Sequence, residues 1–333
     1  MLNPLKYFRN RSVGLALGSG GSKGIAHIAV IEYLESLDIP IHYIAGSSIG
    51  AVVGVIYSAG KLRQFREDLL SMQWREMVSL FDPVFPRTGL MEGRKLVHFL
   101  TNYISRSAKI EDLPVPVAVV ATDYYSGYPL VFRSGNILDA LRASVSIPGV
   151  FTPLRYNETF LLDGGVSNPI PIDVVKKMGA GLTVAVNLHP ALTQKRLKHI
   201  VKKVIKRDSE EESKGLELIK EKTPPPVKDI LGKRGAPWIR SIETWLGIGV
   251  EKMEEERLST PNIFATISQA IDIMEYMNST LILKYYRPTV LIQPDLGWLP
   301  TLDFSQTSRA LTEGYNACSR MQGTIKRRIS YWI

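Results

Sequence analysis

Short apolar runs alternate with longer amphipathic stretches along the first 190 residues of the chain. Short apolar runs bounded by Gly or Pro are typical of buried strands, whereas apolar positions three or four apart are typical of helices. The alternation predicts an α/β fold with a mostly parallel central sheet. Strands are expected at residues 13–17, 41–45, 115–122 and 182–188, with shorter ones at 130–132 and 159–162. Helices are expected from a glycine-rich loop to about residue 37, then at 49–59, onward to 74, at 94–104 and at 173–178.

The composition of the chain changes near Pro190. Residues 191–260 are rich in charge and contain three consecutive prolines. Apolar periodicity returns after Pro261, where two helices (263–285 and 308–328) and a strand (289–292) are expected. We therefore expect one core in two pieces, residues 1–190 and 261–333. Between them lies a partly helical excursion, residues 191–260, that would act as a lid or as a membrane-contact segment.

The positive charge of the chain is concentrated in one stretch. The sequence has 41 Lys and Arg against 32 Asp and Glu, a net charge of +9. Seven of the basic residues lie between Lys195 and Arg207, so the rest of the chain has 34 basic and 32 acidic residues. A nearly neutral remainder argues against a nucleic-acid-binding protein, whose basic surface would extend over the whole domain.

The basic stretch is also amphipathic. One helical face carries lysines, and the opposite face carries Leu197, Ile200, Val201, Val204 and Ile205. A basic amphipathic helix is suited to peripheral contact with an anionic membrane. The alternative is that the apolar face packs on the core and the lysines are solvated, since amphipathicity alone does not separate the two.

The sequence predicts neither a cysteine framework nor a targeting segment. Cys318 is the only cysteine, which excludes an internal disulfide and a Cys-based zinc site. The first residues lead into no apolar signal region, and the longest apolar stretch, near residues 49–57, is far shorter than the roughly 20 residues of a membrane span. We expect a cytoplasmic protein whose contact with membranes is peripheral.

Residues 46–50 form the motif Gly-Ser-Ser-Ile-Gly, a Gly-x-Ser-x-Gly between an expected strand and a small-residue helix. In this context the motif makes a sharp turn that exposes the central serine, Ser48, near a helix N-terminus. Gly46 and Gly50 would allow the neighbouring backbone to approach the elbow closely. The alternative is that both glycines serve only helix–strand packing and that Ser47 or Ser48 caps the helix.

A second glycine-rich loop, Gly18-Ser19-Gly20-Gly21-Ser22-Lys23-Gly24, follows the first expected strand. A P-loop requires Lys followed by Ser or Thr after its last glycine, and this order is missing. A dinucleotide fingerprint requires a third glycine at the position of Lys23. The dinucleotide interpretation stays open although this spacing is off by one, and the third interpretation is a cradle of backbone N–H groups for an oxyanion.

A serine nucleophile requires a base, and His189 is one candidate. It follows the strand at residues 182–188, and the order Ser48, Asp163, His189 is that of the α/β-hydrolase triad. Against this interpretation, only 47 residues precede Ser48, which leaves room for about two strands and is too few for that fold.

Asp163 is the other candidate base. It ends an apolar strand and is followed by Gly164 and Gly165, which leave it uncovered. Partial burial would raise its pKa and make it a better base at neutral pH. An Asx turn that closes a hairpin explains Asp163 equally well, and Asp123, which also follows a strand, competes with it.

Four segments together resemble the patatin-like phospholipase family, close to its bacterial branch related to the neuropathy-target-esterase catalytic domain. The resemblance covers about residues 12–190 and resumes at about 263–328. The segments are the loop 18–24, the elbow 46–50, the stretch 140–151 (ALRASVSIPGVF) and Asp163-Gly164-Gly165 with Asn168 and Pro169 beyond. The loop departs from the family pattern at two positions, with Ser19 where the family often has glycine and Lys23 where arginine is usual.

The resemblance implies a three-layer α/β/α sandwich with a mostly parallel central sheet. It also implies a catalytic dyad without histidine, in which Ser48 is the nucleophile and Asp163 the base. The amides of Gly20 and Gly21, with Lys23 nearby, would form the oxyanion hole. The supporting loop positions are Gly18, Gly24, Gly164 and Gly165.

Members of this family cleave fatty-acyl esters of phospholipids, lysophospholipids or neutral lipids and require no metal or organic cofactor. The resemblance therefore implies a serine lipid acyl hydrolase, of the phospholipase or lysophospholipase type, that works through an acyl-enzyme. Two alternatives remain. One is a lipid acyltransferase with the same dyad, and the other is a non-catalytic lipid-binding regulatory protein.

Overall fold

The structure is a computed structural model that describes residues 11–72, 91–189, 263–297 and 299–329. The first elements in chain order are β1 (Val13–Leu17), η2 (Gly21–Ile25), α1 (Ala26–Glu35), β2 (Tyr43–Ser47), α2 (Ile49–Ser58), α3 (Leu62–Ser71) and α5 (Arg94–Leu100). Next come η3 (Ile110–Asp112), β3 (Val117–Asp123), β4 (Pro129–Phe132), α6 (Ile137–Ser144), β5 (Leu154–Tyr156), β6 (Thr159–Asp163), η4 (Gly164–Val166), α7 (Ile172–Lys177) and β7 (Leu182–Val186). The last are α10 (Ile263–Tyr286), β8 (Val290–Ile292), η6 (Phe304–Gln306) and α11 (Thr307–Arg328).

The strands of the described residues form one mixed sheet in the order β5-β6-β3-β2-β1-β7-β8, and β4 pairs with β3. The five strands from β3 to β8 in this order are parallel to one another. The strands β4, β5 and β6 pair in antiparallel register. Because β1 and β2 are parallel neighbours, their carboxyl ends meet at one edge of the sheet, and the two glycine motifs follow there.

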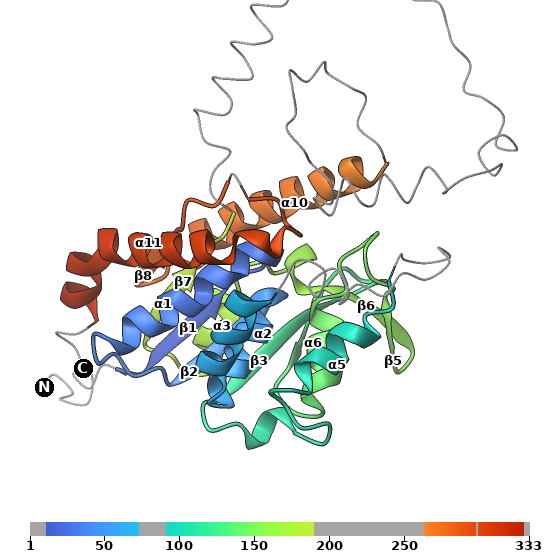
Figure 1. Cartoon of the computed structure of the whole chain (residues 1–333), viewed down its shortest axis with the longest axis horizontal. Helices are drawn as coiled ribbons and strands as arrows, with labels where there is room; N and C mark the ends of the chain where they lie inside the picture. Colours follow the sequence, from blue (N-terminus) through green and yellow to red (C-terminus); the bar gives the residue numbers. More distant parts are fainter. Residues whose placement is uncertain (1–10, 73–90, 190–262, 298, 330–333) are drawn as a thin grey trace, which may run out of the picture.

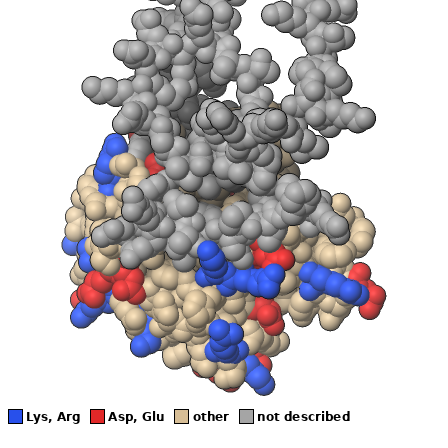
Figure 2. Space-filling model, turned by 45° about the vertical axis from the view of Figure 1, so that its right-hand side comes forward, with Lys and Arg blue, Asp and Glu red and all other residues tan. Residues whose placement is uncertain are grey.

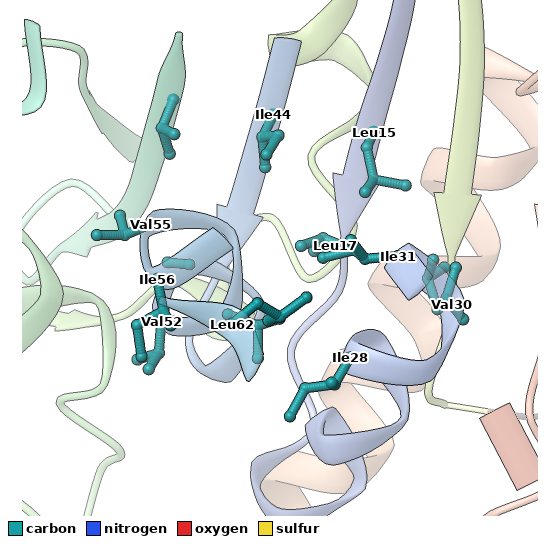
Figure 3. Close-up of a cluster of buried hydrophobic side chains, with 14 of the residues drawn as sticks. Leu15, Leu17, Ile28, Val30, Ile31, Ile44, Val52, Val55, Ile56 and Leu62 are labelled. Atoms are coloured by element: carbon teal, nitrogen blue, oxygen red, sulfur yellow. The ribbon is translucent and has the colours of Figure 1, made fainter. Parts of the chain in front are cut away.

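Helices cover both faces of the sheet, which gives the three-layer α/β/α architecture that the resemblance implied (Figure 1). Side chains of β1 alternate between the faces. Leu15 and Leu17 pack with α1 and α2 on one side, whereas Ala16 packs with α7 on the other. Figure 3 shows the first of these clusters, to which Ile28 and Ile31 of α1 also belong. The buried strands carry mostly small or β-branched side chains, which fit between two helical layers.

The C-terminal residues add to the same sheet and to its helical cover. Strand β8 extends the sheet beside β7, with Val186 opposite Ile292. Helix α11 lies beside α1 (Figure 1), and a Cβ at Gly314 would lie 2.7 Å from the carbonyl oxygen of Ala26. Only a residue without a side chain allows these two helices to approach so closely.

The apolar pattern predicted most of these elements within a few residues. It missed β5 and α6. Strand β5 has three residues, too few for a period to emerge. Helix α6 carries buried Arg142 within its apolar face, which interrupts the pattern. The predicted excursion at 191–260, with its basic stretch, lies outside the described residues.

The described residues show how charged side chains are distributed over one face of the surface and whether a described helix could cross a membrane. On the face shown in Figure 2, basic and acidic side chains are interspersed among neutral ones wherever the structure describes the chain. Among the described helices, none combines the length and the apolar composition needed to cross a membrane.

Candidate active site

Ser48 lies at the turn between β2 and α2, in a backbone conformation that side-chain-bearing residues rarely adopt. Its φ is 55° and its ψ is −126°. Its N–H donates to Ser144 Oγ at 2.8 Å, and Ser144 Oγ in turn donates to the carbonyl oxygen of Val120 at 2.6 Å. Strain of this kind persists only where surrounding contacts hold it, and it is common at functional sites. Ser144, on α6, provides one such contact.

Close backbone packing explains the two glycines that flank this turn. A Cβ at Gly46 would lie 2.4 Å from the backbone nitrogen of Ala51, and one at Gly50 would lie 2.3 Å from the carbonyl oxygen of Leu17. Helix α2 therefore begins directly against the ends of β1 and β2. The packing interpretation of the glycines is correct, and the same packing places Ser48 at the edge of the sheet.

Asp163 ends β6 and meets Ser48 across the sheet. Ser48 Oγ donates a hydrogen bond of 2.6 Å to Asp163 Oδ2, and the Gly165 N–H donates one of 2.7 Å to Asp163 Oδ1. Burial raises the pKa of Asp163 to about 7, and these two hydrogen bonds oppose the rise. The carboxyl group thus has the basicity that general-base chemistry needs near neutral pH. A Cβ at Gly164 would lie 2.2 Å from the carbonyl oxygen of Val120.

The glycine loop after β1 presents two unused amide groups. The N–H groups of Gly18, Ser19, Ser22 and Lys23 donate to backbone carbonyls. For Gly20 and Gly21, no acceptor is found among the described residues. Both line a small cavity together with Ser48 and Asp163. Gly21 has a φ of 56°, and a Cβ there would lie 2.0 Å from the carbonyl oxygen of Thr301.

The other predicted positions of this loop contribute packing and charge. A Cβ at Gly24 would lie 2.1 Å from Cγ2 of Ile49, so this glycine brings η2 against the start of α2. Gly18 accepts a hydrogen bond from the buried His27 ring at 2.7 Å. Lys23 is buried and does not line the cavity beside Ser48, whereas its charge lowers the pKa of His189. The Lys23 N–H donates to the Gly20 carbonyl oxygen at 3.2 Å, so Lys23 closes the turn that carries Gly20 and Gly21.

An apolar cavity of about 100 Å³ opens on the other side of Ser48. Its walls come from α2, α3 and α5, the segment after α6, and the residues before α11. Such a cavity suits a hydrocarbon chain, because it would bury apolar surface without leaving polar groups unpaired. It is lined by Gly21, Ser48, Ile49, Val52, Phe65, Leu69, Met72, Leu96, Phe99, Leu100, Val145, Ile147, Phe151, Leu302 and Phe304.

The structure does not bring His189 to Ser48. His189 Nε2 lies 3.1 Å from Ser19 Oγ and 3.2 Å from Glu275 Oε2. Burial lowers the pKa of His189 to about 3, so the ring is neutral at physiological pH. The Ser48 hydroxyl donates to Asp163 instead. This geometry gives no support to a Ser–Asp–His triad.

Asp123 is also remote from the serine. It is half-buried, and it accepts hydrogen bonds from Ser126 and from the Thr159 hydroxyl. These bonds lower the pKa of Asp123 to about 2, the reverse of what a general base needs. The Asx-turn interpretation describes one part of Asp163, whose Oδ1 accepts from the Gly165 N–H, and the same carboxyl group also accepts from Ser48.

Sequence reasoning missed two polar residues beside the site. Ser144 lies within the stretch 140–151 but has no role predicted from the sequence, and no sequence pattern points to Glu275. Glu275 lines the same small cavity as Ser48 and Asp163. Its local signal is weak, since an acid within an apolar helix faces solvent more often than a cavity.

Within the described residues, one group of side chains has the composition of a metal site. His189, Asp272 and Glu275 each offer a ligand atom, and these atoms lie within 4.8 Å of one another. His189 already contacts Glu275 and Ser19. The Lys23 charge also acts on both His189 and Glu275, and a nearby cation opposes the binding of another. The contacts present thus account for the group without a metal.

Comparison with known proteins agrees with the geometry. Residues 15–176 match the family model of the patatin-like phospholipases. The chain is 40% identical over 177 residues to an uncharacterized NTE family protein of Mycobacterium bovis, covering 53% of this chain and 49% of that protein. It is 32% identical over 190 residues to lysophospholipase NTE1 of Scheffersomyces stipitis, covering 55% of this chain and 12% of that protein. It is 31% identical over 187 residues to patatin-like phospholipase domain-containing protein 7 of Mus musculus, covering 53% of this chain and 14% of that protein.

The chain spans about half the length of the mycobacterial relative and a much smaller share of the two eukaryotic ones. The resemblance drawn from the sequence motifs is confirmed. The chain carries a patatin-like phospholipase domain related to the NTE family.

Proposed function

We propose that this protein is a serine lipid acyl hydrolase of the phospholipase or lysophospholipase type, with Ser48 as nucleophile and Asp163 as base. The observation that carries the proposal is the 2.6 Å hydrogen bond from Ser48 Oγ to Asp163 Oδ2, within a cavity that Gly20 and Gly21 also line. The names of the similar lysophospholipase and phospholipase-domain proteins support the same class of substrate.

In the first half of the reaction, Ser48 Oγ attacks the carbonyl carbon of an acyl ester while Asp163 takes the hydroxyl proton. The amides of Gly20 and Gly21 stabilise the oxyanion, a contribution of about 3–4 kcal/mol for each well-placed donor. Asp163 then gives its proton to the leaving alcohol as the carbon–oxygen bond breaks. The product is an acyl-enzyme on Ser48 and a free alcohol.

In the second half, Asp163 removes a proton from a water molecule that attacks the acyl-enzyme. The second tetrahedral intermediate uses the same amide donors, and the proton returns to Ser48 Oγ as the fatty acid leaves. The acyl chain would occupy the apolar cavity beside Ser48, whose walls offer it no polar partner to displace. Long acyl chains should therefore bind better than acetyl groups.

The test is hydrolysis of lysophospholipid, phospholipid and short-chain esters by the purified protein and its Ser48→Ala variant. Ser47→Ala is the matched control, because Ser47 is also buried and its hydroxyl has no partner among the described residues. We expect Ser48→Ala to lose fatty-acid release and labelling by a fluorophosphonate probe, and Ser47→Ala to keep both. Equal activity in the two variants would reject Ser48 as the nucleophile.

The same experiment separates hydrolase from acyltransferase and from a non-catalytic lipid-binding protein. An acceptor alcohol added to the assay would receive the acyl group if transfer is the physiological reaction. We propose hydrolysis, and we therefore expect free fatty acid to remain the main product. Binding of lipid without turnover by the unaltered protein would support the regulatory alternative.

Contact with an anionic membrane through the stretch from Lys195 to Arg207 is a separate part of the proposal. These residues lie outside the described ones, so it rests on their sequence pattern alone. Co-sedimentation with anionic and with neutral vesicles tests it. We expect binding to anionic vesicles that deletion of the stretch abolishes, and unchanged binding after the deletion would reject the idea.

A further inference from the structure

Glu275 is a buried acid that the dyad chemistry does not use. It lies in the middle of α10 and is 5% exposed. Its Oε2 lies 3.2 Å from Nε2 of the buried His189, which also lies 3.1 Å from Ser19 Oγ. We refer to Ser19, His189 and Glu275 as the Glu275 cluster. A buried acid without a role is unusual, because its desolvation opposes folding.

The cluster joins the two loops that the proposed mechanism brings together. A Cβ at Gly165 would lie 1.8 Å from Glu275 Oε1 and 2.7 Å from Ser19 Oγ, so both side chains rest directly on this glycine. The Gly165 N–H is the donor that holds Asp163 Oδ1. Ser19 immediately precedes Gly20. Glu275 and Ser19 therefore both contact the backbone of the turn that carries Asp163. Ser19 also belongs to the loop that carries the Gly20 and Gly21 amides, which we call the amide loop.

We propose that Glu275 is a positioning residue, which with Ser19 and His189 fixes the amide loop against the turn of Asp163. The proposal rests on the proposed function, since it assigns the cluster to that reaction. Glu275 touches no reacting atom in it. It acts through Gly165 and Ser19, whose positions set the direction of the Asp163 carboxylate and of the amide groups.

The charged groups around Glu275 decide its protonation state. Asp163 faces it from β6, Asp272 lies one turn before it on α10, His189 lies beyond β7 and Lys23 lies on η2. Burial first, and then the two aspartates, raise the pKa of Glu275 to about 8, against the opposing effects of the Ser19 hydroxyl and the Lys23 charge. Burial also keeps His189 neutral, and of the two acids Asp163 is the one that ionises more readily, because it accepts from Ser48 and Gly165.

Ser19 has two partners that hold it in the cluster. In this chain its hydroxyl lies 3.1 Å from His189 Nε2, and its N–H donates to the carbonyl oxygen of Pro169 at 2.9 Å. The serine therefore has a partner that a glycine would lack. Ser19, His189 and Glu275 form one unit although 256 positions separate the first from the last.

Steady-state kinetics of Glu275→Gln and Glu275→Ala test the positioning role. We expect Glu275→Ala to lower kcat about 100-fold with little change in KM, the size of effect that follows a misplacement of about 1 Å. Glu275→Gln keeps a neutral group of the same shape and should rescue kcat at pH 7. Ser19→Ala, which removes one hydroxyl, should lower kcat by about tenfold, as loss of one buried hydrogen bond does. Ser279→Ala, another buried α10 position, is the matched control.

The pH dependence gives a readout that simple packing would not move. The unaltered protein should lose kcat above pH 8, where ionised Glu275 adds a second negative charge beside the oxyanion, and Glu275→Gln should not. Glutamine as harmful as alanine, or a folded Glu275→Ala protein with nearly full kcat, would overturn the proposal.

A stability measurement tests the protonation state of Glu275 independently of the proposed function. A neutral buried carboxyl makes the unaltered protein less stable, relative to Glu275→Gln, as the pH rises from 5 to 9. The urea midpoints of the two proteins should therefore diverge over this range, whether or not Ser48 proves to be the nucleophile. Parallel midpoints would overturn the neutral state of Glu275.

Discussion

Replacement of Asp163 by Asn should make the protein inactive and, at neutral to alkaline pH, more stable. Asn has the shape of Asp and can still accept a hydrogen bond from the Gly165 N–H or from the Ser48 hydroxyl. It cannot accept a proton. The substitution therefore removes the base from the proposed mechanism while it keeps the packing of the turn between β6 and η4.

The size of the stability effect follows from the burial of the Asp163 carboxyl group. Its pKa rises from 3.8 to about 7 on folding, and one pKa unit corresponds to about 1.4 kcal/mol. Because the folded-state pKa is raised, no penalty exists below pH 3.8, where the group is protonated in both states. The penalty grows as the pH rises towards 7 and then levels off at about 4 kcal/mol. Loss of a general base lowers kcat about 10²- to 10⁴-fold.

The assay pairs ester hydrolysis with urea unfolding at several pH values between 5 and 9. The free energy of unfolding of Asp163→Asn should exceed that of the unaltered protein by an amount that increases up to about pH 7. Hydrolysis by the unaltered protein should rise over the same range as Asp163 ionises. A stability difference that does not change with pH would refute the argument that burial tunes this carboxyl, and substantial activity in the variant would refute its role as base.

Three further substitutions test the surroundings of the dyad. Ser144→Ala leaves the buried Ser48 N–H without its acceptor, so unfolding free energy should fall by about 1–3 kcal/mol and kcat should fall with it; chemical denaturation and ester hydrolysis measure both. Gly50→Ala places a Cβ 2.3 Å from the carbonyl oxygen of Leu17 and should destabilise the protein by about 1–3 kcal/mol or more, measured by urea unfolding. Leu96→Trp fills part of the apolar cavity and should shift the kcat/KM optimum towards shorter acyl chains; an unchanged chain-length profile would remove that cavity from the acyl site.

The local pattern was enough to predict the parallel strands and the two glycine motifs. Strand β1 and strand β2 are short apolar runs, and each is followed by glycines that only a tight turn or a close approach explains. These features depend on neighbouring residues, so a single sequence carries them. The base that accompanies Ser48 was harder to predict, because the sequence offered both His189 and Asp163 as candidates. The choice depends on which of them the sheet brings to the end of β2.

The contacts around Glu275 could not be predicted from the pattern. Helix α10 has Asp272 and Glu275 among apolar residues, and the period of a helix does not tell which side of it a neighbouring loop will cover. Gly165 leaves room for the Glu275 carboxyl by having no side chain. That relation joins positions 110 residues apart and becomes visible only when the sheet is assembled.

The site gathers several features that oppose folding at the carboxyl edge of an otherwise apolar sheet. Ser48 has a positive φ, Asp163 and Glu275 are buried acids, and the Gly20 and Gly21 amides have no acceptor among the described residues. Each costs stability when considered alone, and each is what acyl transfer requires: a hydroxyl that lines a cavity, a basic carboxylate and unused donors. The clusters on both faces of the sheet supply the stability that tolerates them. Substitutions that relieve the site should therefore stabilise the protein at the expense of activity, whereas substitutions in the helical layers should reduce both.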